Sequence, residues 1–209
     1  MKNMREIVSW QHEIITSRKQ LKTWLSYERK KYKSVTPIWW LIPATEQDAI
    51  WKYQRRLRVT EYHLNTQHRL RYPISRFLLH QMQFRYGMKI RLNSCGKGLK
   101  IMHLGSILTN GDWGEDCSLH VNVSIVSGGR DTGTPVIGSH NVIGVGAVVL
   151  GSVKLGEGIA VGANAVVTKS FEENDIAIAG VPARKISENG SGTWNKGWRK
   201  GESDKDAAE

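Results

Sequence analysis

The sequence predicts an all-β solenoid, a parallel β-helix of hexapeptide repeats, preceded by an α-helical N-terminal region. Its main signal is an aliphatic anchor at every sixth position, and glycine follows four of the six anchors. A period of six fits neither the 3.6-residue repeat of a helix nor an uninterrupted strand, but it fits short strands separated by turns. Such arrays are typical of β-helices, in which each coil stacks on the next. The anchors are Ile137, Ile143, Val149, Leu155, Val161 and Val167.

Three helices are expected before the repeats. Apolar residues among many Lys and Arg predict the first helix over residues 7–32. Thr45, followed three residues later by Asp48, predicts the capping-box start of a second helix. Pro73 opens a third helix, and Gly87 ends it.

The six-residue register also extends backwards from the main array. Trp113 is its odd member, because a large indole requires either small neighbours such as Gly111 and Gly114 or a widened first coil. The register breaks at residues 127–135, a Gly-rich stretch without an anchor. Insertions in solenoids form loops on one face, often the binding face, so this stretch is the candidate active-site loop. The earlier anchors are Ile101, Ile107, Trp113, Leu119 and Ile125.

The expected organisation has three parts: a helical region over residues 1–87, a β-helix over 88–186 and a flexible tail over 187–209. Charge follows this division, since residues 1–98 hold 20 Lys and Arg against 6 Asp and Glu, which gives +14. The excess fits a weak association with an anionic membrane or polysaccharide, or a solvated helical face. No nucleic-acid-binding signature accompanies it, so no nucleic-acid partner is expected.

The cysteines and the N-terminus indicate a cytoplasmic protein. Cys95 and Cys117 lie in different segments, without a metal-ligand spacing, and predict two free thiols. The first residues lack the basic cluster and apolar run of a signal peptide. No stretch approaches the ~20 apolar residues of a membrane span.

Several motifs carry a resemblance to a known family. They are residues 143–147 (Ile-Gly-Val-Gly-Ala), 161–169 (Val-Gly-Ala-Asn-Ala-Val-Val-Thr-Lys), 180–184 (Gly-Val-Pro-Ala-Arg) and 99–107 (Leu-Lys-Ile-Met-His-Leu-Gly-Ser-Ile). Together they resemble the left-handed β-helix acyltransferases, in the serine acetyltransferase-like and polysaccharide O-acetyltransferase branch. The resemblance implies a left-handed β-helix, acetyl-CoA as donor without a required metal, and a homotrimer with active sites between neighbouring subunits.

The resemblance also suggests the catalytic histidine. O-acetyl transfer needs a base because a neutral alcohol that keeps its hydroxyl proton is a poor nucleophile, and histidine titrates near the operating pH. His103 matches the family's catalytic histidine, whereas His120, one coil later, is either a second, substrate-binding histidine or an ordinary surface residue. The family's acidic partner is absent from residues 87–92. A backbone carbonyl, Asp112 or Asp116 is therefore expected to orient the imidazole.

A second departure concerns the acceptor. True serine acetyltransferases carry an Arg-His pair where this chain reads Gly-Thr-Pro at residues 133–135, and Arg130 and Asp131 are displaced from that position. Because both the acidic partner and the Arg-His pair are missing, we expect the acceptor to be a hydroxyl of a sugar or polysaccharide precursor slightly ahead of that of L-serine. Backbone amides of residues 127–129 are the candidate donors to the oxyanion.

The residues that match the family's acetyl-CoA contacts fall into two types. Val145 and Ala163 are expected at coil corners, where small side chains let the pantetheine arm lie against the backbone. Thr168, Lys169 and Arg184 follow near the end of the array. The two cations have a physical role, because CoA carries phosphates.

Two other functions use the same kind of repeat. A non-catalytic scaffold protein would have the array without binding acetyl-CoA. A γ-carbonic anhydrase would need three histidines around zinc at a subunit interface. His103, His120 and His140 are the repeat-region candidates, and their spacing does not suit one site.

Overall fold

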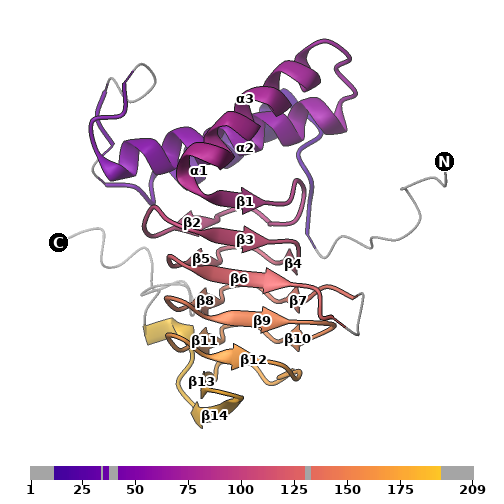
Figure 1. Cartoon of the computed structure of the whole chain (residues 1–209). Helices are drawn as coiled ribbons and strands as arrows, with labels where there is room; N and C mark the ends of the chain where they lie inside the picture. The colour runs from indigo at the N-terminus through magenta and orange to yellow at the C-terminus, as the bar shows by residue number, and fades with distance from the viewer. Residues whose placement is uncertain (1–11, 34, 38–41, 130–132, 194–209) are drawn as a thin grey trace.

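A computed structural model describes residues 12–33, 35–37, 42–129 and 133–193. Three helices, α1 (Arg18–Arg29), α2 (Glu46–Asn65) and α3 (Arg71–Tyr86), lie together at one end of a stack of short strands (Figure 1). The β-region follows the helices in sequence and extends away from them as one column. The architecture is therefore a set of parallel sheets preceded by N-terminal helices, and the parallel sheets agree with the prediction from the repeat.

The helix starts follow local capping chemistry. The predicted capping box is confirmed, because Thr45 Oγ1 accepts the N–H of Asp48 at 3.1 Å and the Asp48 carboxylate accepts the N–H of Thr45 at 3.1 Å. Helix α1 starts later than predicted. Its N-cap is Ser17, whose hydroxyl accepts the N–H of Gln20, and residues 12–17 are not helical. The remainder of the predicted start, residues 7–11, lies outside the described residues.

Helix α3 has a predicted end and an unexpected start. It begins at Arg71, two residues before Pro73, and proline in the first turn is tolerated because its missing N–H would have no partner there. Gly87 ends the helix with φ of 68°, in the left-handed region that favours glycine. The chain then enters the first strand directly.

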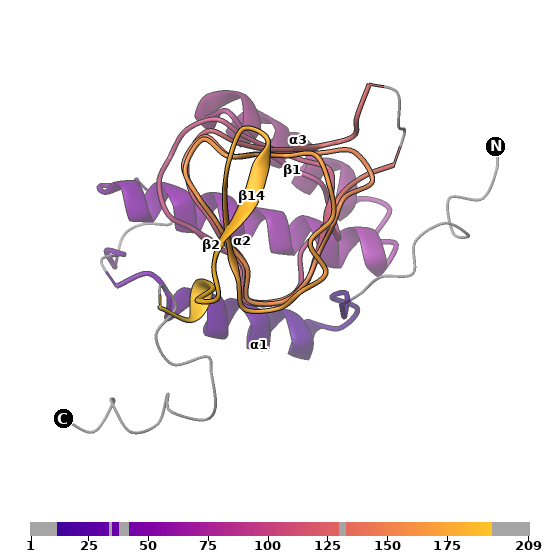
Figure 2. The same ribbon diagram turned by 90° about the horizontal axis from the view of Figure 1, so that it is seen from below.

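The strands form three sheets, and the chain passes through them in turn except at the first and last strands. Seen along the column, the successive rounds lie over one another (Figure 2). Within the described residues, paired strands run parallel in all three sheets except β13 and β14, which are antiparallel. The first sheet contains β1 (Met88–Ile90), β3 (Ile107–Thr109), β6 (Val123–Val126), β9 (Val148–Leu150) and β12 (Val166–Val167). The second contains β4 (Asp112–Trp113), β7 (Val136–Ile137) and β10 (Lys154–Leu155). The third contains β2 (Lys100–Ile101), β5 (Ser118–Leu119), β8 (Val142–Ile143), β11 (Ala160–Val161), β13 (Ala177–Gly180) and β14 (Ala183–Ser187).

The repeat anchors form the core of these coils, where a coil is one round through the three sheets. Every anchor is buried, with at most 4% of its surface exposed. Along the third sheet the anchors stack directly, with Ile143 between Leu119 and Val161. The first sheet deviates, because Thr109 rather than Ile107 pairs with Ile125. The six-residue spacing therefore predicts burial throughout but not the register of the first regular coil.

Trp113 lies in that irregular coil and is the largest fully buried side chain of the described residues. Its small neighbours are required by coil stacking. A Cβ on Gly111 would lie 2.7 Å from the Pro135 carbonyl oxygen, and one on Gly114 would lie 2.3 Å from Ser139 Oγ. Both obstructing atoms belong to the next coil, so these glycines allow two coils to approach closely.

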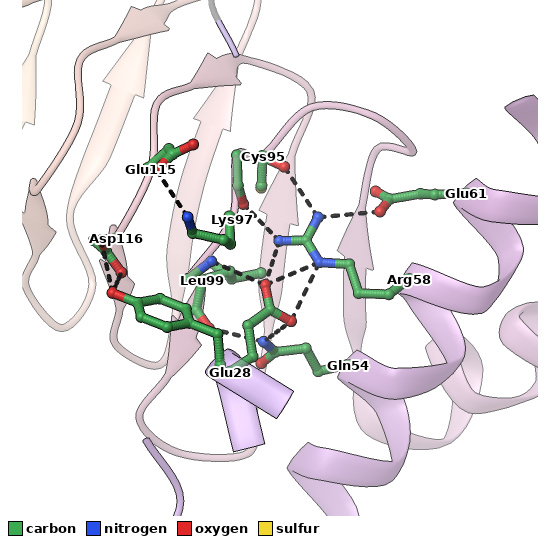
Figure 3. Close-up of polar contacts among 12 residues, drawn as sticks. Glu28, Gln54, Arg58, Glu61, Cys95, Lys97, Leu99, Glu115 and Asp116 are labelled. Atoms are coloured by element: carbon green, nitrogen blue, oxygen red, sulfur yellow. Dashed lines mark hydrogen bonds and ion pairs between the residues drawn. The ribbon is translucent and has the colours of Figure 1, made fainter. Parts of the chain in front are cut away.

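A buried ionic cluster joins the helices to the first coil (Figure 3). Arg58 of α2 and Glu28 of α1 are both fully buried, and their closest N–O distance is 2.7 Å. Arg58 also binds Glu61 at 3.0 Å and donates to the carbonyl oxygens of Cys95 and Gly96 at 3.0 and 2.6 Å. The guanidinium thus fixes two helices to the backbone of the coil that they cover.

Part of the predicted tail is packed on the coils. Ser191 is fully buried; its N–H donates to the Gly158 carbonyl at 2.7 Å, and its hydroxyl donates to the His140 carbonyl at 2.5 Å. These bonds hold Ser191, which lies beyond the expected domain limit at residue 186, against the coils. Residues 194–209 lie outside the described residues.

Both cysteines are free, as the sequence predicted, and both are buried. Burial raises the pKa of the Cys95 thiol and of the Cys117 thiol to about 12, so neither forms a nucleophilic thiolate near pH 7. Within the described ranges, none of the helices is both long and apolar enough for a transmembrane span.

Candidate active site

Four of the predicted site residues share one edge of the column, the corner between the third and first sheets. His103 follows β2, His120 follows β5, Val145 follows β8 and Ala163 follows β11. Backbone hydrogen bonds hold these corners in register, including one of 2.7 Å from the Asn164 N–H to the Val145 carbonyl. We call this corner the histidine edge. Sequence positions 60 residues apart thereby form one continuous strip.

His103 lies at the helical end of this edge. Its side chain is 57% exposed, and its Nδ1 lies 3.3 Å from Oε2 of Glu46, the first residue of α2. The other carboxylate oxygen of Glu46 accepts the N–H of Leu104 at 2.8 Å. A single carboxylate therefore contacts both the imidazole and the adjacent backbone.

The expected orienting groups, Asp112 and Asp116, do not contact His103. Asp112 forms an ion pair with Arg91. Asp116 pairs with Lys31 at 2.6 Å and accepts the Tyr27 hydroxyl at 2.9 Å. Both carboxylates bind other groups, so the expectation that Asp112 or Asp116 orients the imidazole is not supported.

His120 lies on the next coil and is half-buried. Burial lowers its pKa, and the nearby positive charges of His103 and Lys100 lower it further. Its ring is therefore neutral near pH 7.

Thr168 and Lys169 lie on a different edge, the corner between the first and second sheets, which we call the loop edge. They follow β12 and line an open pocket of about 540 Å³. Gly128 lines the same pocket, which places the start of the candidate active-site loop here. Residues 130–132, with the displaced Arg130 and Asp131, lie outside the described residues. The full lining is Gly128, Leu150, Gly151, Ser152, Val153, Thr168, Lys169 and Ser170.

The structure thus separates the predicted acetyl-CoA residues into two groups. Val145 and Ala163 are exposed on the histidine edge, whereas Thr168 and Lys169 are exposed on the loop edge. Arg184, on β14, is also exposed, and within the described ranges neither it nor Lys169 forms an ion pair with a carboxylate. Both cations are therefore available to an anionic ligand.

The histidines that a zinc site would need are not gathered. His140 lies at the corner between the second and third sheets, away from the histidine edge. Among the described residues, no three His, Cys, Asp or Glu side chains form a group that could hold a metal ion.

Comparison with known proteins assigns the family. No family model matches the chain. The chain is 31% identical over 121 residues to a serine acetyltransferase of Helicobacter pylori (strain J99), and the match covers 56% of this chain and 70% of that protein. The chain belongs to the serine acetyltransferase family. A serine acetyltransferase of Synechococcus elongatus is 29% identical over 150 residues, which cover 68% of this chain and 54% of that protein. The chain thus spans about half the length of this relative.

Solved structures of this family share the fold. A serine acetyltransferase of Brucella abortus superposes with a TM-score of 0.65 at 19% identity, covering 83% of this chain and 72% of the other. The soybean enzyme superposes with a TM-score of 0.60 at 23% identity, covering 79% and 69%. At these identities the likeness supports the hexapeptide-repeat architecture, and the resemblance drawn from the sequence motifs is confirmed at the level of the family.

Proposed function

We propose that this chain is an acetyl-CoA-dependent O-acetyltransferase that acts on a hydroxyl of a small acceptor, with His103 as general base. The observation that carries the proposal is the histidine edge, where an exposed imidazole lies on the same strip as Val145 and Ala163. Two family structures support the donor and the acceptor class, since one serine acetyltransferase was solved in complex with CoA and the soybean enzyme in complex with serine.

The proposed reaction is one proton cycle on His103. Its free ring nitrogen accepts the proton of the acceptor hydroxyl while the oxygen forms a bond to the acetyl carbonyl carbon. The carbon–sulfur bond then breaks, and the imidazolium returns the proton to the departing thiolate. Acetyl-CoA supplies the activated acetyl group, and the histidine ends in its starting protonation state.

The residues on the page fit the chemical character of acetyl-CoA. The small exposed side chains of Val145 and Ala163 leave the backbone of the histidine edge accessible to a narrow, mainly apolar pantetheine chain. Beyond this strip, Lys169 and Arg184 offer cations for phosphates. Thr168 adds a hydroxyl next to Lys169. Val145 and Ala163 lie on the histidine edge, whereas Thr168 and Lys169 lie on the loop edge. This separation limits how the four residues can contact one acetyl-CoA molecule.

That separation supports the proposal of a homotrimer. Within one chain, Lys169 and the amides of residues 127–129 lie on the loop edge, whereas His103 lies on the histidine edge. A cyclic assembly would bring the histidine edge of one subunit against the loop edge of its neighbour. The active site would then form between subunits, as the family resemblance implies.

The choice between a sugar and L-serine as acceptor rests on the sequence motifs alone. We propose a hydroxyl of a sugar or polysaccharide precursor slightly ahead of L-serine, because the Arg-His pair is replaced by residues 133–135. We further propose closure of the three sheets into a left-handed β-helix, and domain limits at residues 87 and 186. A cytoplasmic location is consistent with two free, buried thiols.

Exposed charge supports the proposal that the basic N-terminal half attracts an anionic membrane or polysaccharide. Helix α1 ends in a Lys- and Arg-rich segment with exposed Lys30 and Lys33. Some of the positive charge is neutralised inside the fold, since Arg58 is buried between carboxylates. Sedimentation with anionic vesicles at low salt tests this, and equal recovery with neutral vesicles would contradict it.

The experiment that tests the main proposal measures CoA release with a thiol reagent, using L-serine and a panel of monosaccharides as acceptors. His103→Ala should lower kcat about 10²- to 10⁴-fold. Acetyl-CoA should still raise the melting temperature of this variant, because binding to the folded state stabilises it by mass action.

Three outcomes would contradict parts of the proposal. Full activity of His103→Ala would reject His103 as the general base. A melting temperature unaffected by acetyl-CoA in the natural sequence would favour the scaffold alternative. Turnover of serine alone would reverse the acceptor ranking.

A further inference from the structure

We propose that Glu46 is the positioning residue of His103, a role in which the first turn of α2 replaces an acid from the preceding coil. This inference rests on the proposed function of His103. The two residues are 57 positions apart in sequence, and their contact of 3.3 Å joins the helical region to the histidine edge. Among the described residues, Glu46 is the carboxylate that pairs with His103, whereas Asp112 and Asp116 have other partners.

The geometry assigns the proton on the imidazole. An ionised carboxylate only accepts hydrogen bonds, so the Nδ1 atom that faces Glu46 must donate. In the neutral ring this leaves Nε2 with its lone pair, which is the form a general base needs. When Nε2 takes a proton from the acceptor, the ring becomes positive next to the negative carboxylate. Glu46 therefore both selects the tautomer and stabilises the charged form.

The carboxylate is itself held in place. Its Oε1 accepts the N–H of Leu104 at 2.8 Å, so the side chain bridges the imidazole and the backbone of the same corner. Glu46 is also the first residue after the N-cap Thr45, where the unpaired amides of the helix favour a negative charge. Asp48 fixes this helix end by accepting the N–H groups of Thr36, Ala44 and Thr45. The base is thus oriented by a group on a rigid element.

The test separates a role in catalysis from a role in folding. The Glu46 and His103 side chains are 45% and 57% exposed, so Glu46→Ala should leave the melting temperature within about 2 °C of the natural sequence. Its kcat for CoA release should fall about tenfold or more, with the KM for acetyl-CoA unchanged. Glu46→Gln retains an acceptor for the Leu104 N–H but no charge, and it should show a similar loss. The matched control is Glu115→Ala, which removes a half-exposed carboxylate paired with Lys97 at another corner.

A double variant and an NMR measurement complete the test. Adding Glu46→Ala to His103→Ala should cause no further loss, because Glu46 acts through the histidine. The ¹⁵N shifts of the neutral His103 ring should report Nδ1–H in the natural sequence and a shift towards Nε2–H in Glu46→Ala. A kcat within twofold of the natural sequence for Glu46→Ala, while His103→Ala is inactive, would overturn the role of Glu46 alone. An unchanged tautomer would also overturn it, even if His103 proved not to be the base.

Discussion

Replacing Arg58 with alanine should destabilise the protein more than any surface ion-pair change. The substitution removes the guanidinium from between Glu28 and Glu61 and leaves both carboxylates buried without their cation. It also removes the donors to the carbonyl oxygens of Cys95 and Gly96. Breaking a buried ion pair in this way costs about 3–5 kcal/mol. For a chain of this size that corresponds to a fall in melting temperature of about 6–20 °C.

Thermal unfolding followed by circular dichroism measures this effect, and Lys97→Ala is the matched control. Lys97 lies 3.7 Å from Glu115 in an exposed pair, whose loss should cost about 0–1 kcal/mol. The melting temperature of Arg58→Lys should lie between those of Arg58→Ala and Lys97→Ala, since lysine keeps the charge but not the paired donors. A melting temperature of Arg58→Ala within about 3 °C of the natural sequence would refute the reasoning.

The pH dependence gives an independent check on the same cluster. Burial raises the pKa of Glu61, and the charge of Arg58 opposes that rise. Without Arg58 the pKa of Glu61 should rise further. A carboxyl whose folded pKa lies above its unfolded value binds more protons in the native state, so the free energy of unfolding increases as the pH falls. The stability difference between Arg58→Ala and the natural sequence should therefore narrow from pH 7 to pH 5.

Three further predictions concern the coils and the proposed site. Gly114→Ala should cost about 1–3 kcal/mol in urea unfolding, because its Cβ would lie 2.3 Å from a side-chain oxygen of the next coil; an unchanged midpoint would contradict the close stacking. Lys169→Ala and Arg184→Ala should each raise the KM for acetyl-CoA up to about tenfold at constant kcat, and equal KM values would remove them from the cofactor site. The pKa of His120 by NMR should lie below its ordinary value and rise in His103→Ala, because that variant removes one of the charges that lower it.

Local patterns in the sequence were sufficient for the repeat and for one helix start. The six-residue anchors are buried because each lies at a fixed place in its coil, and the Thr45–Asp48 box forms within one turn of helix. Neither signal contains information about contacts between residues far apart in the sequence. Glu46 meets His103 only because α2 lies across the first coil, and nothing in the spacing of the two residues indicates that contact. The strand pairing of Ile107 with Val123 likewise depends on how one coil packs on the next.

Helix α2 links the stability of the fold to the geometry of the proposed site. Arg58 fixes this helix to the coil backbone, and Glu46 lies twelve residues earlier on the same helix, about 18 Å along its axis. A rigid helix held at Arg58 and capped through Asp48 leaves the Glu46 carboxylate little freedom to move away from His103. The buried ion pair then has a consequence beyond stability, because loosening α2 would also disorder the group that orients the base. On this argument Arg58→Lys, measured well below its melting temperature, should lower kcat in proportion to the loss of the Nδ1–H tautomer of His103.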